Sequence, residues 1–394
     1  MTMVSGRSAP HTGAEAPEIS RCPVCGGAER VLLDLGEVPV NVTALHRSAA
    51  AALAAPSGRF ELTLCDGCGY VRNRAFDESL LTYDEQYENA LDFSPTFREY
   101  RDHLADALFQ RYGLGGREIV EIGCGQGAFL AALCRDGRAR GRGFDPSHRP
   151  GDEPLPGTVR IERTHFDPAL HRDGGALLCG RHVLEHLPDP LAFLTALRPA
   201  TSAVYLEVPS GNAVFGGDGC WDLIYQHVSY FSAATLVRLL ERAGFGVTDV
   251  RERFGDQYLS VEARNGGAST VTRPDVASFV QRADDGAATL RGRLAAARHR
   301  IRTEHAAGRT VAIWGAGAKA ATFLNLVGEP VDAAVDLNPR KHGTFVAGTA
   351  VEIAAPARLA TLRPGTVFIF NPVYRTEIAS ELASLDVAAE VLLP

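Results

Sequence analysis

Apolar positions along the chain follow a strand pattern in some segments and a helix pattern in others. Between residues 118 and 208, short apolar runs alternate with segments of helical periodicity, and we expect strands at 118–122, 141–144, 175–178 and 203–208. Runs of consecutive apolar residues are typical of strands buried on both faces of a parallel sheet. The pattern therefore predicts an α/β fold, in which helices cover both faces of a parallel sheet.

Two helical segments flank this alternating region. From Phe97 to Tyr112, aromatic and leucine residues recur at helical spacing, which predicts an amphipathic helix leading into the sheet. A polar run rich in Ala and Arg spans 273–305 and begins with Pro274, a residue favoured in the first turn of a helix. We expect an exposed connecting helix there. A second α/β unit opens with the apolar run at 311–314 and continues to the end of the sequence.

The length of 394 residues indicates two to four domains at roughly 100–200 residues each. The first twenty residues are rich in Ser, Ala, Pro and Gly without periodicity, which predicts a disordered tail. We therefore expect a tail at 1–20, a small metal-binding module at 21–80, a central Rossmann-like domain at 81–270, and a C-terminal Rossmann-like α/β domain at 271–394.

Composition excludes several classes of partner. The net charge is −7, with 45% hydrophobic and 22% charged residues, as in ordinary globular proteins. No concentrated basic field is present, which argues against a nucleic-acid-binding surface. No run approaches the ~20 apolar residues of a membrane-spanning helix, and the first residues lack the apolar segment of a signal peptide. We expect a cytoplasmic protein that binds neither nucleic acid nor membrane.

Four of the eight cysteines form two closely spaced pairs. Two residues separate the thiols in each pair, so both sulfurs can point at one centre, and the glycine after each second cysteine permits the positive φ of a tight turn. Four thiolates predict a structural zinc site, because they leave no open position for catalysis. Two disulfides or a redox-active pair are the alternatives, which reduced cytosolic thiols and the doubled pair disfavour. The expected ligands are Cys22, Cys25, Cys65 and Cys68.

A glycine-rich segment after the first predicted strand of the sheet indicates a ligand-binding loop. Glu121 precedes Gly123, Gly125 and Gly127, and a helix is expected to begin near residue 128. This G-x-G-x-G spacing differs from the G-x-G-x-x-G of dinucleotide-binding domains, and the carboxylate favours an amino group over a phosphate. Asp145 closes the next strand, where a carboxylate can accept both hydrogen bonds of a ribose diol. A simple β–α turn is the alternative.

This loop, Asp145 and the run from His182 to His186 together resemble the class I S-adenosylmethionine-dependent methyltransferases. The resemblance implies that the loop residues line the methionine and ribose of that cofactor and that Asp145 holds the ribose hydroxyls. Arg181 and His182, which follow the strand expected at 175–178, would border the cofactor. Glu185 and His186 would be either catalytic or braces of their loop. The implied cofactor-binding residues are Glu121, Gly123, Gly125, Gly127, Asp145, Arg181 and His182.

The order of motifs along the whole chain is similar to that of the sugar C-methyltransferases of antibiotic deoxysugar biosynthesis. The paired cysteines, the loop at 36–41, the central domain and a glycine turn at 315–319 follow one another in the same order. The resemblance implies a nucleotide-linked 4-keto sugar as substrate, and a Tyr-His-Glu-His segment that carries the chemistry. Here the segment reads Tyr225-Gln226-His227, which is one residue shorter and has Gln in place of Glu.

Carbon methylation beside a ketone requires removal of a weakly acidic proton, which the imidazole of His227 can accept near neutral pH. The Tyr225 hydroxyl or the Gln226 amide would donate to the developing enolate oxygen. Unlike Glu, Gln cannot carry the charge that raises the basicity of a histidine, so methylation of a hydroxyl oxygen is an alternative. A non-catalytic relative that only binds the cofactor is a second alternative, in which His227 is a packed loop histidine.

Several residues are expected to contact the substrate. Gln257 and Tyr258 precede a predicted strand and would face it. Lys319 would meet a phosphate at a helix N-terminus, together with a nearby loop, although the G-x-G at 315–317 is only half of a dinucleotide fingerprint. Asn371 and Tyr374 follow a later predicted strand, and ligands of open sheets bind at such strand ends. The alternative for the residues of the C-terminal unit is that they only stabilise the interface between domains. These residues are Lys319, Asn338, Lys341, Asn371 and Tyr374.

Overall fold

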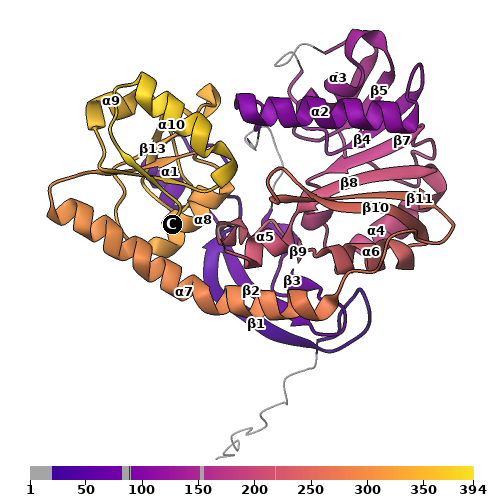
Figure 1. The fold of residues 1–394 in the computed structure, drawn as a ribbon, viewed down its shortest axis with the longest axis horizontal. Helices are drawn as coiled ribbons and strands as arrows, with labels where there is room; N and C mark the ends of the chain where they lie inside the picture. Colours follow the sequence, from indigo (N-terminus) through magenta and orange to yellow (C-terminus); the bar gives the residue numbers. More distant parts are fainter. Residues whose placement is uncertain (1–19, 82–87, 89, 151–154, 218) are drawn as a thin grey trace, which may run out of the picture.

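The computed structural model describes residues 20–81, 88, 90–150, 155–217 and 219–394. Within these ranges the chain forms three β-sheets with helices packed around them (Figure 1). The tail expected at 1–20 falls, except for residue 20, outside the described residues. Among the described helices, none combines the length and the apolar character needed to span a bilayer.

The N-terminal sheet is antiparallel and has the strand order β1-β2-β3-β9. Its strands are β1 Glu29–Pro39, β2 Ser57–Cys65, β3 Val71–Asn73 and β9 Ser229–Tyr230, with α1 Ala49–Leu53 between β1 and β2 and η1 Glu78–Leu80 after β3. The last strand, β9, comes from far along the chain, and its Tyr230 pairs with Val71 of β3. The cysteine-containing segment is therefore joined through backbone hydrogen bonds to the segment around residue 229.

The central sheet has the strand order β10-β11-β8-β7-β4-β5-β6. Its strands are β4 Glu118–Ile122, β5 Arg140–Phe144, β6 Val159–Glu162, β7 Leu177–Arg181, β8 Ala203–Pro209, β10 Phe245–Arg253 and β11 Tyr258–Asn265. The run from β8 to β6 is parallel, whereas β11 is antiparallel to β8 and to β10. The prediction of an α/β fold is confirmed. The strand expected at 175–178 begins later, at Leu177, because Gly175 adopts a left-handed turn conformation with φ 68°.

Helices cover both faces of this sheet. On one face, α2 and α3 pack against Ile119 and Leu177, and on the other, α4 and α6 pack against Val120 and Leu178. Figure 1 shows these pairs on opposite sides of the sheet. The helical segments of this region are α2 Pro95–Tyr112, α3 Ala128–Leu133, η2 Arg135–Gly137, η3 Leu184–His186, α4 Pro190–Leu197, η4 Arg198–Ala200, α5 Gly211–Phe215, η5 Cys220–Asp222 and α6 Ala233–Arg242.

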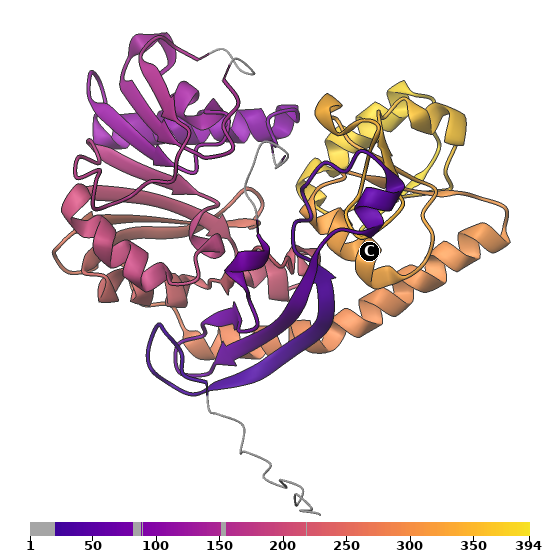
Figure 2. The ribbon, with the colours of Figure 1, turned by 180° about the vertical axis from the view of Figure 1, so that it is seen from behind.

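A long helix, α7 Val276–Ala306, connects the central sheet to the C-terminal unit. Figure 2 shows it running past the strands β1 and β2. The expectation of an exposed helix is wrong for one of its faces, because Phe279, Leu290 and Ile301 are buried in a core shared with β1 and β2. The Asp284 carboxylate also accepts two hydrogen bonds from Arg30 of β1, at 2.9 and 2.7 Å.

The C-terminal sheet has the strand order β14-β15-β13-β12-β16-β17 and is parallel except for β14. Its elements are β12 Val311–Trp314, α8 Ala318–Val327, β13 Ala333–Val335, η6 Pro339–Lys341, β14 Thr344–Phe345, β15 Glu352–Ala354, α9 Arg358–Leu362, β16 Thr366–Ile369, η7 Pro372–Tyr374, α10 Arg375–Ser384 and β17 Glu390–Leu392. The first strand lies where the apolar pattern places it. In the described part of the chain, the central and C-terminal sheets are thus mainly parallel, and loops follow the carboxyl ends of their parallel strands.

Candidate functional site

A cavity of about 940 Å³ opens between the central sheet and the C-terminal unit. Loops after β4, β5, β7 and β8 line one side of it, and loops after β12, β13 and β16 line the other. Ligands of open α/β sheets bind at such carboxyl edges. The residues expected from the sequence that line this cavity are Glu121, Gly123, Gly125, Asp145, Arg181, His182, Gln226, His227, Tyr258, Lys319, Lys341, Asn371 and Tyr374.

The glycine-rich loop turns sharply after β4. Gly123 and Gly125 have φ values of 64° and 56°, and a Cβ on Gly123 would lie 2.4 Å from a methyl group of Val183. Gly127, by contrast, does not line the cavity. It precedes α3 with φ 87°, and a Cβ there would lie 2.6 Å from Ile161. The structure therefore gives Gly127 a packing role behind the loop instead of the expected contact with a ligand.

Asp145 both holds the glycine-rich loop in place and faces the cavity. One of its carboxylate oxygens accepts a hydrogen bond from the backbone N–H of Gly125 at 2.8 Å, and the other accepts from the backbone N–H of Ser147 at 2.8 Å. The second oxygen also accepts from the Ser147 hydroxyl at 2.6 Å, whereas the oxygen bonded to Gly125 keeps a lone pair that can accept from a ligand. This arrangement fits a hydroxyl group of a ribose.

Glu121 is a buried carboxyl group, 2% exposed, whose Oε2 has no hydrogen-bond partner among the described residues. Burial raises its pKa to about 8, the nearby Arg181 opposes the rise, and Asp145 and Asp92 add to it. A buried carboxyl without a partner is costly, and a ligand ammonium group would satisfy it. The residues around Glu121 therefore fit a ligand that carries both an amino group and a ribose, as S-adenosylmethionine does.

Charged groups next to this loop form a network that the sequence alone did not indicate. Arg181 Nε donates to Glu207 at 2.9 Å, and Glu207 also accepts from the hydroxyls of Tyr100 and Tyr205. Glu207 lies inside β8 and carries no recognisable motif, so its role emerges only from the pairing of β7 with β8. The network anchors Arg181 at the cavity wall.

His182 lies between two carboxylates in a left-handed backbone conformation with φ 55°. Its ring nitrogens are 3.4 Å from Glu185 Oε1 and 3.5 Å from Glu207 Oε1. Burial alone would lower the pKa of His182, but the two carboxylates outweigh it and raise that pKa to about 9. The ring is therefore an imidazolium at neutral pH. Non-glycine residues with positive φ are uncommon and gather at functional sites.

The loop that carries Gln226 and His227 is attached to the N-terminal sheet. The carbonyl of Val228 accepts a 2.9 Å hydrogen bond from the backbone N–H of Asn73, directly before β9 pairs with β3. Nδ1 of His227 has no hydrogen-bond partner among the described residues, and burial lowers the pKa of His227 to about 4. The ring is therefore neutral at neutral pH and retains a lone pair. The Gln226 amide lines the cavity and donates to Asn41 at 3.4 Å.

Tyr225 points away from the cavity, although it is adjacent to these residues in sequence. Its hydroxyl accepts a 2.9 Å hydrogen bond from the backbone N–H of Asp77, and its ring packs on Phe76 with centroids 5.4 Å apart. The side chain is 1% exposed in the core beneath β2. The expected role of Tyr225 as a donor to an enolate is thus corrected, because its hydroxyl is held on the opposite side of the loop.

On the C-terminal side, two lysines reach the cavity. Lys319 Nζ donates to Gln257 at 3.0 Å and lies 3.4 Å from Asp222, near the start of α8. Lys341 Nζ donates to Asp336 at 2.9 Å. Gln257 does not line the cavity, so the structure places it as a support for Lys319 and not as the expected substrate contact.

Asn338 is also a support. Its side chain is 1% exposed, lies off the cavity lining, and donates to Glu88 at 3.1 Å, while its backbone N–H donates to Asp336. Both contacts fix the loop that carries Lys341. The expected contact of Asn338 with a substrate phosphate is therefore corrected to a positioning contact.

An aromatic wall completes the cavity. The ring of Tyr258 lies 4.5 Å from that of His182 and is stacked on Phe254 at 5.3 Å. Tyr374 contacts the same Phe254 edge to face at 5.7 Å. Next to Tyr374, the Asn371 side chain accepts from the N–H of Val373 and so caps η7. Through the contact of Phe254 with Tyr374, the wall connects the central and C-terminal units.

The four paired cysteines converge outside this cavity. Their sulfurs all lie within 4.8 Å of one another, with Cys22 and Cys68 3.5 Å apart and Cys25 and Cys65 3.4 Å apart. Gly26 and Gly69 have φ values of 78° and 72°, as the turn argument requires. Thiolates about 2.3 Å from a tetrahedral zinc ion lie at similar separations. All eight cysteines belong to the described residues, and no disulfide is formed among them. The sulfurs thus fit a zinc ion.

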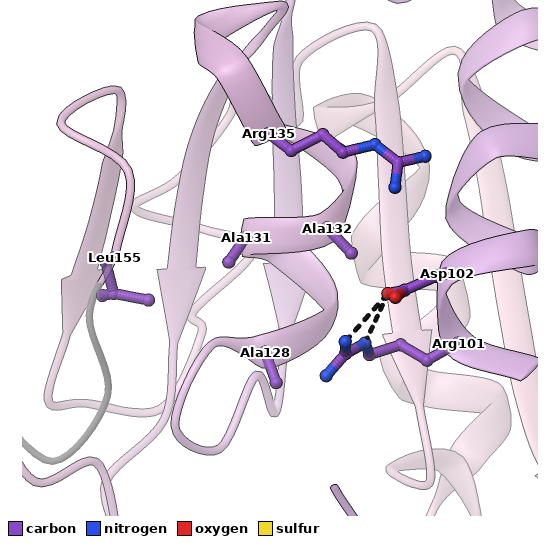
Figure 3. A pocket seen from close by; sticks show the side chains of 7 residues that line it. All are labelled: Arg101, Asp102, Ala128, Ala131, Ala132, Arg135 and Leu155. Carbon is purple, nitrogen blue, oxygen red and sulfur yellow. Dashed lines mark hydrogen bonds and ion pairs between the residues drawn. The ribbon is translucent and has the colours of Figure 1, made fainter. Parts of the chain in front are cut away.

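A smaller hollow of about 300 Å³ lies between α2 and α3 (Figure 3). Its charged residues are already paired, because Arg101 contacts Asp102 at 2.8 Å and Asp92 at 2.6 Å. Alanines of α3 form the opposite wall. The hollow therefore presents matched charges and small side chains instead of convergent polar groups.

Comparison with known proteins accounts for both lobes of the large cavity. Residues 97–250 match a family model described as a methyltransferase domain, and residues 275–391 match one described as a C-methyltransferase C-terminal domain. The chain therefore carries a methyltransferase domain followed by a C-methyltransferase C-terminal domain. The methyltransferase is 26% identical over 390 residues to the C-methyltransferase NovU of Streptomyces niveus, and the match covers 91% of each chain.

Two solved structures of methyltransferases are similar to part of the chain. An S-adenosylmethionine-dependent methyltransferase from Mesorhizobium loti shares 18% identity with a TM-score of 0.34, over 42% of this methyltransferase and 99% of that chain. The magnesium protoporphyrin IX methyltransferase of Synechocystis PCC 6803, with bound S-adenosylmethionine, shares 18% identity with a TM-score of 0.32, over 43% of this methyltransferase and 80% of that chain.

Proposed function

We propose that this methyltransferase methylates a carbon atom of a nucleotide-activated keto-deoxysugar in natural-product biosynthesis. One observation carries the proposal: a single cavity joins the pocket around Glu121 and Asp145 to the lysines of the C-terminal unit, and His227 lies on its wall. The full-length similarity to a protein named a C-methyltransferase supports carbon as the acceptor. We further propose that the chain divides into domains near residues 80 and 270.

S-adenosylmethionine, when bound, supplies an electrophilic methyl group. Glu121 would receive its amino group, because the carboxyl is buried and one oxygen lacks a partner. Asp145 would accept from a ribose hydroxyl through the lone pair that remains on Oδ2 after its contacts with Gly125 and with the backbone N–H and hydroxyl of Ser147. Arg181 and His182 border the same pocket and hold their places through Glu207.

His227 would take the proton from the carbon next to the ketone of the substrate. The ring is neutral, so its lone pair is available, while the burial that lowers its pKa also makes it a weaker base than free imidazole. With Tyr225 turned away, the Gln226 amide is the remaining donor for the developing enolate oxygen, since it has a second N–H besides the one bonded to Asn41. Oxygen methylation stays the alternative, because Gln226 cannot add negative charge next to the base.

The substrate diphosphate would lie between Lys319 and Lys341, which provide positive charge on the C-terminal wall. Tyr258, Asn371 and Tyr374 would contact the remainder of the molecule, since all three line the cavity. Few local donors suffice for one diphosphate, which agrees with the absence of a basic field in a sequence of net charge −7.

We infer that Cys22, Cys25, Cys65 and Cys68 hold a structural zinc ion. The module carries β3, and β3 holds the His227 loop through its pairing with β9. The hydroxyl of Tyr70, which follows the second cysteine pair, hydrogen-bonds Ser229 at 2.6 Å. The zinc site would therefore support catalysis by positioning the loop and not by direct chemistry.

The test is turnover of a panel of nucleotide-linked 4-keto sugars and of the corresponding sugar alcohols. Formation of S-adenosylhomocysteine with a keto sugar supports the proposal. Turnover with alcohols only would support oxygen methylation. Cofactor binding with no turnover on either class would reject the enzyme for these substrates and support the non-catalytic alternative.

A further inference from the structure

A second group of metal-ligand side chains lies on the wall of the large cavity. Glu185 and His186 belong to η3, and His227 comes from the loop before β9. One ligand atom from each of these residues lies within 4.8 Å of the other two. We propose that Glu185, His186 and His227 bind a divalent transition-metal ion, at a site separate from the four cysteines.

Two of the three side chains are buried and carry a polar atom that has no hydrogen-bond partner among the described residues. Glu185 is 1% exposed; its Oε1 lies 3.4 Å from the His182 ring, and its Oε2 has no partner among the described residues. His227 is 9% exposed, and its Nδ1 has no partner within the same part of the chain. Buried polar atoms of this kind are rare and costly in native proteins. A bound cation would satisfy the carboxylate and the ring nitrogen together.

The third side chain is held as metal-binding histidines usually are. Nδ1 of His186 donates a 2.9 Å hydrogen bond to the carbonyl oxygen of Gln226, the residue before His227. Such a bond from the second ring nitrogen to a carbonyl fixes the orientation and the tautomer of a ligating imidazole. It also ties η3 to the His227 loop, so the two rings lie with centroids 5.0 Å apart.

The donor set indicates the class of ion. Two imidazoles and one carboxylate suit divalent iron, manganese, cobalt, nickel or zinc, and leave further coordination positions open. Neighbouring ligand atoms about 2.1 Å from an ion lie roughly 3.0 Å apart in an octahedral site and roughly 3.4 Å apart in a tetrahedral one, so side-chain adjustments would close the observed spacing.

The surrounding charges bear on affinity. His182 contacts Glu185 at 3.4 Å, and Lys319 and Asp222 lie near His227. The cation at His182 opposes a metal ion, whereas Asp222 favours it. We therefore expect binding in the micromolar range instead of the tight retention of a thiolate site.

Metal binding would have a consequence for catalysis, and this consequence rests on the proposed function. A metal ion at His227 uses the lone pair that a general base needs. Metal and substrate proton would compete for the same side chain, so occupancy of this site would inhibit the methyltransferase.

Cobalt(II) titration of the full-length protein, with zinc kept at the cysteines, tests the site directly. We expect visible d–d absorption that saturates at one added cobalt per chain, without the near-ultraviolet thiolate charge-transfer band of a cysteine site. Glu185→Gln and His186→Ala should each weaken cobalt binding at least tenfold. His305→Ala is the matched control, because it removes the histidine of another histidine–carboxylate pair, His305 with Asp332 at 2.9 Å, and should leave binding unchanged.

Absence of the absorption in the unchanged protein, or equal cobalt binding by Glu185→Gln, would overturn the proposal. Turnover measured on the same samples separates the two proposals. Loss of turnover on cobalt binding supports the site and the base together. Saturated absorption with turnover unchanged or increased would keep the metal site and remove His227 as the base.

Discussion

The ammonium group of Lys319 donates a 3.0 Å hydrogen bond to the side-chain oxygen of Gln257, and this contact links the C-terminal unit to the central sheet. Lys319 lines the cavity, whereas Gln257 lies behind it. The lysine is thus positioned by a residue of the opposite lobe. A substrate that bridges the two lobes would meet a charge already in place.

Replacement of Lys319 by Ala should raise KM for the nucleotide-linked substrate about tenfold or more, because a hydrogen bond to a charged group contributes about 1.5–3 kcal/mol. Affinity for S-adenosylhomocysteine should stay unchanged. Gln257→Ala should also raise KM for the nucleotide-linked substrate, by a smaller factor, and leave the affinity for S-adenosylhomocysteine unchanged. Steady-state kinetics measure both, with Arg302→Ala, an exposed cation paired with Glu329, as control. Equal KM values for Lys319→Ala and the unchanged enzyme would argue against a phosphate contact.

His227→Asn should lower kcat by about 10²–10⁴, the usual contribution of a general base, while cofactor affinity is retained. Tyr225→Phe is the matched comparison, because it removes a nearby hydroxyl that contacts Asp77 outside the cavity. We expect it to cost about 0.5–1.5 kcal/mol of stability with little change in kcat. A kcat loss in Tyr225→Phe as large as in His227→Asn would contradict the placement of the tyrosine.

Loss of the cysteine site should reduce activity at a distance. Cys65→Ser is expected to lower bound zinc by one equivalent per chain, destabilise the N-terminal sheet and decrease kcat, because β3 holds the His227 loop through β9. Metal analysis and thermal unfolding check this, with the buried Cys134→Ala as a control that keeps its zinc. Unchanged zinc content in Cys65→Ser would exclude the proposed ligand.

Glu121 should make the stability of the cofactor-free protein depend on pH. Its pKa rises from 4.5 to about 8 in the fold because of burial, with Asp145 and Asp92 adding to the rise and Arg181 opposing it. Between these values the unfolded chain releases the proton and the folded chain keeps it, so this residue lowers stability as pH increases. Glu121→Gln removes the effect.

The free energy of unfolding of Glu121→Gln should therefore improve relative to the unchanged protein from pH 5 to pH 8. The expected gain is a few kcal/mol, since each pKa unit corresponds to about 1.4 kcal/mol. Urea denaturation at several pH values measures it. Parallel pH profiles for the two proteins would show that the carboxyl is not held protonated.

The strands and the glycine loop were predictable because local pattern determines them. The apolar runs gave β4 its bounds, Glu118–Ile122, and the paired glycines placed the cysteine turns. These features depend on short stretches of backbone, in which periodicity and φ preferences act directly.

The side-chain roles that failed depend on tertiary packing. Tyr225 and His227 are two residues apart, yet one faces the N-terminal core and the other the cavity. Glu207 pairs with Arg181 only because β7 and β8 are adjacent strands. No local signal in the sequence distinguishes these arrangements, because they depend on contacts between segments that are far apart in the chain.

The most direct test of the central claim is the position of a transferred label. The enzyme would be incubated with S-adenosylmethionine carrying a ¹³C-methyl group and with a nucleotide-linked 4-keto deoxysugar, and the product examined by NMR. The account predicts ¹³C bonded to a ring carbon next to the ketone, with one S-adenosylhomocysteine formed per product. A labelled methyl group on oxygen, or no labelled sugar despite bound cofactor, would contradict it.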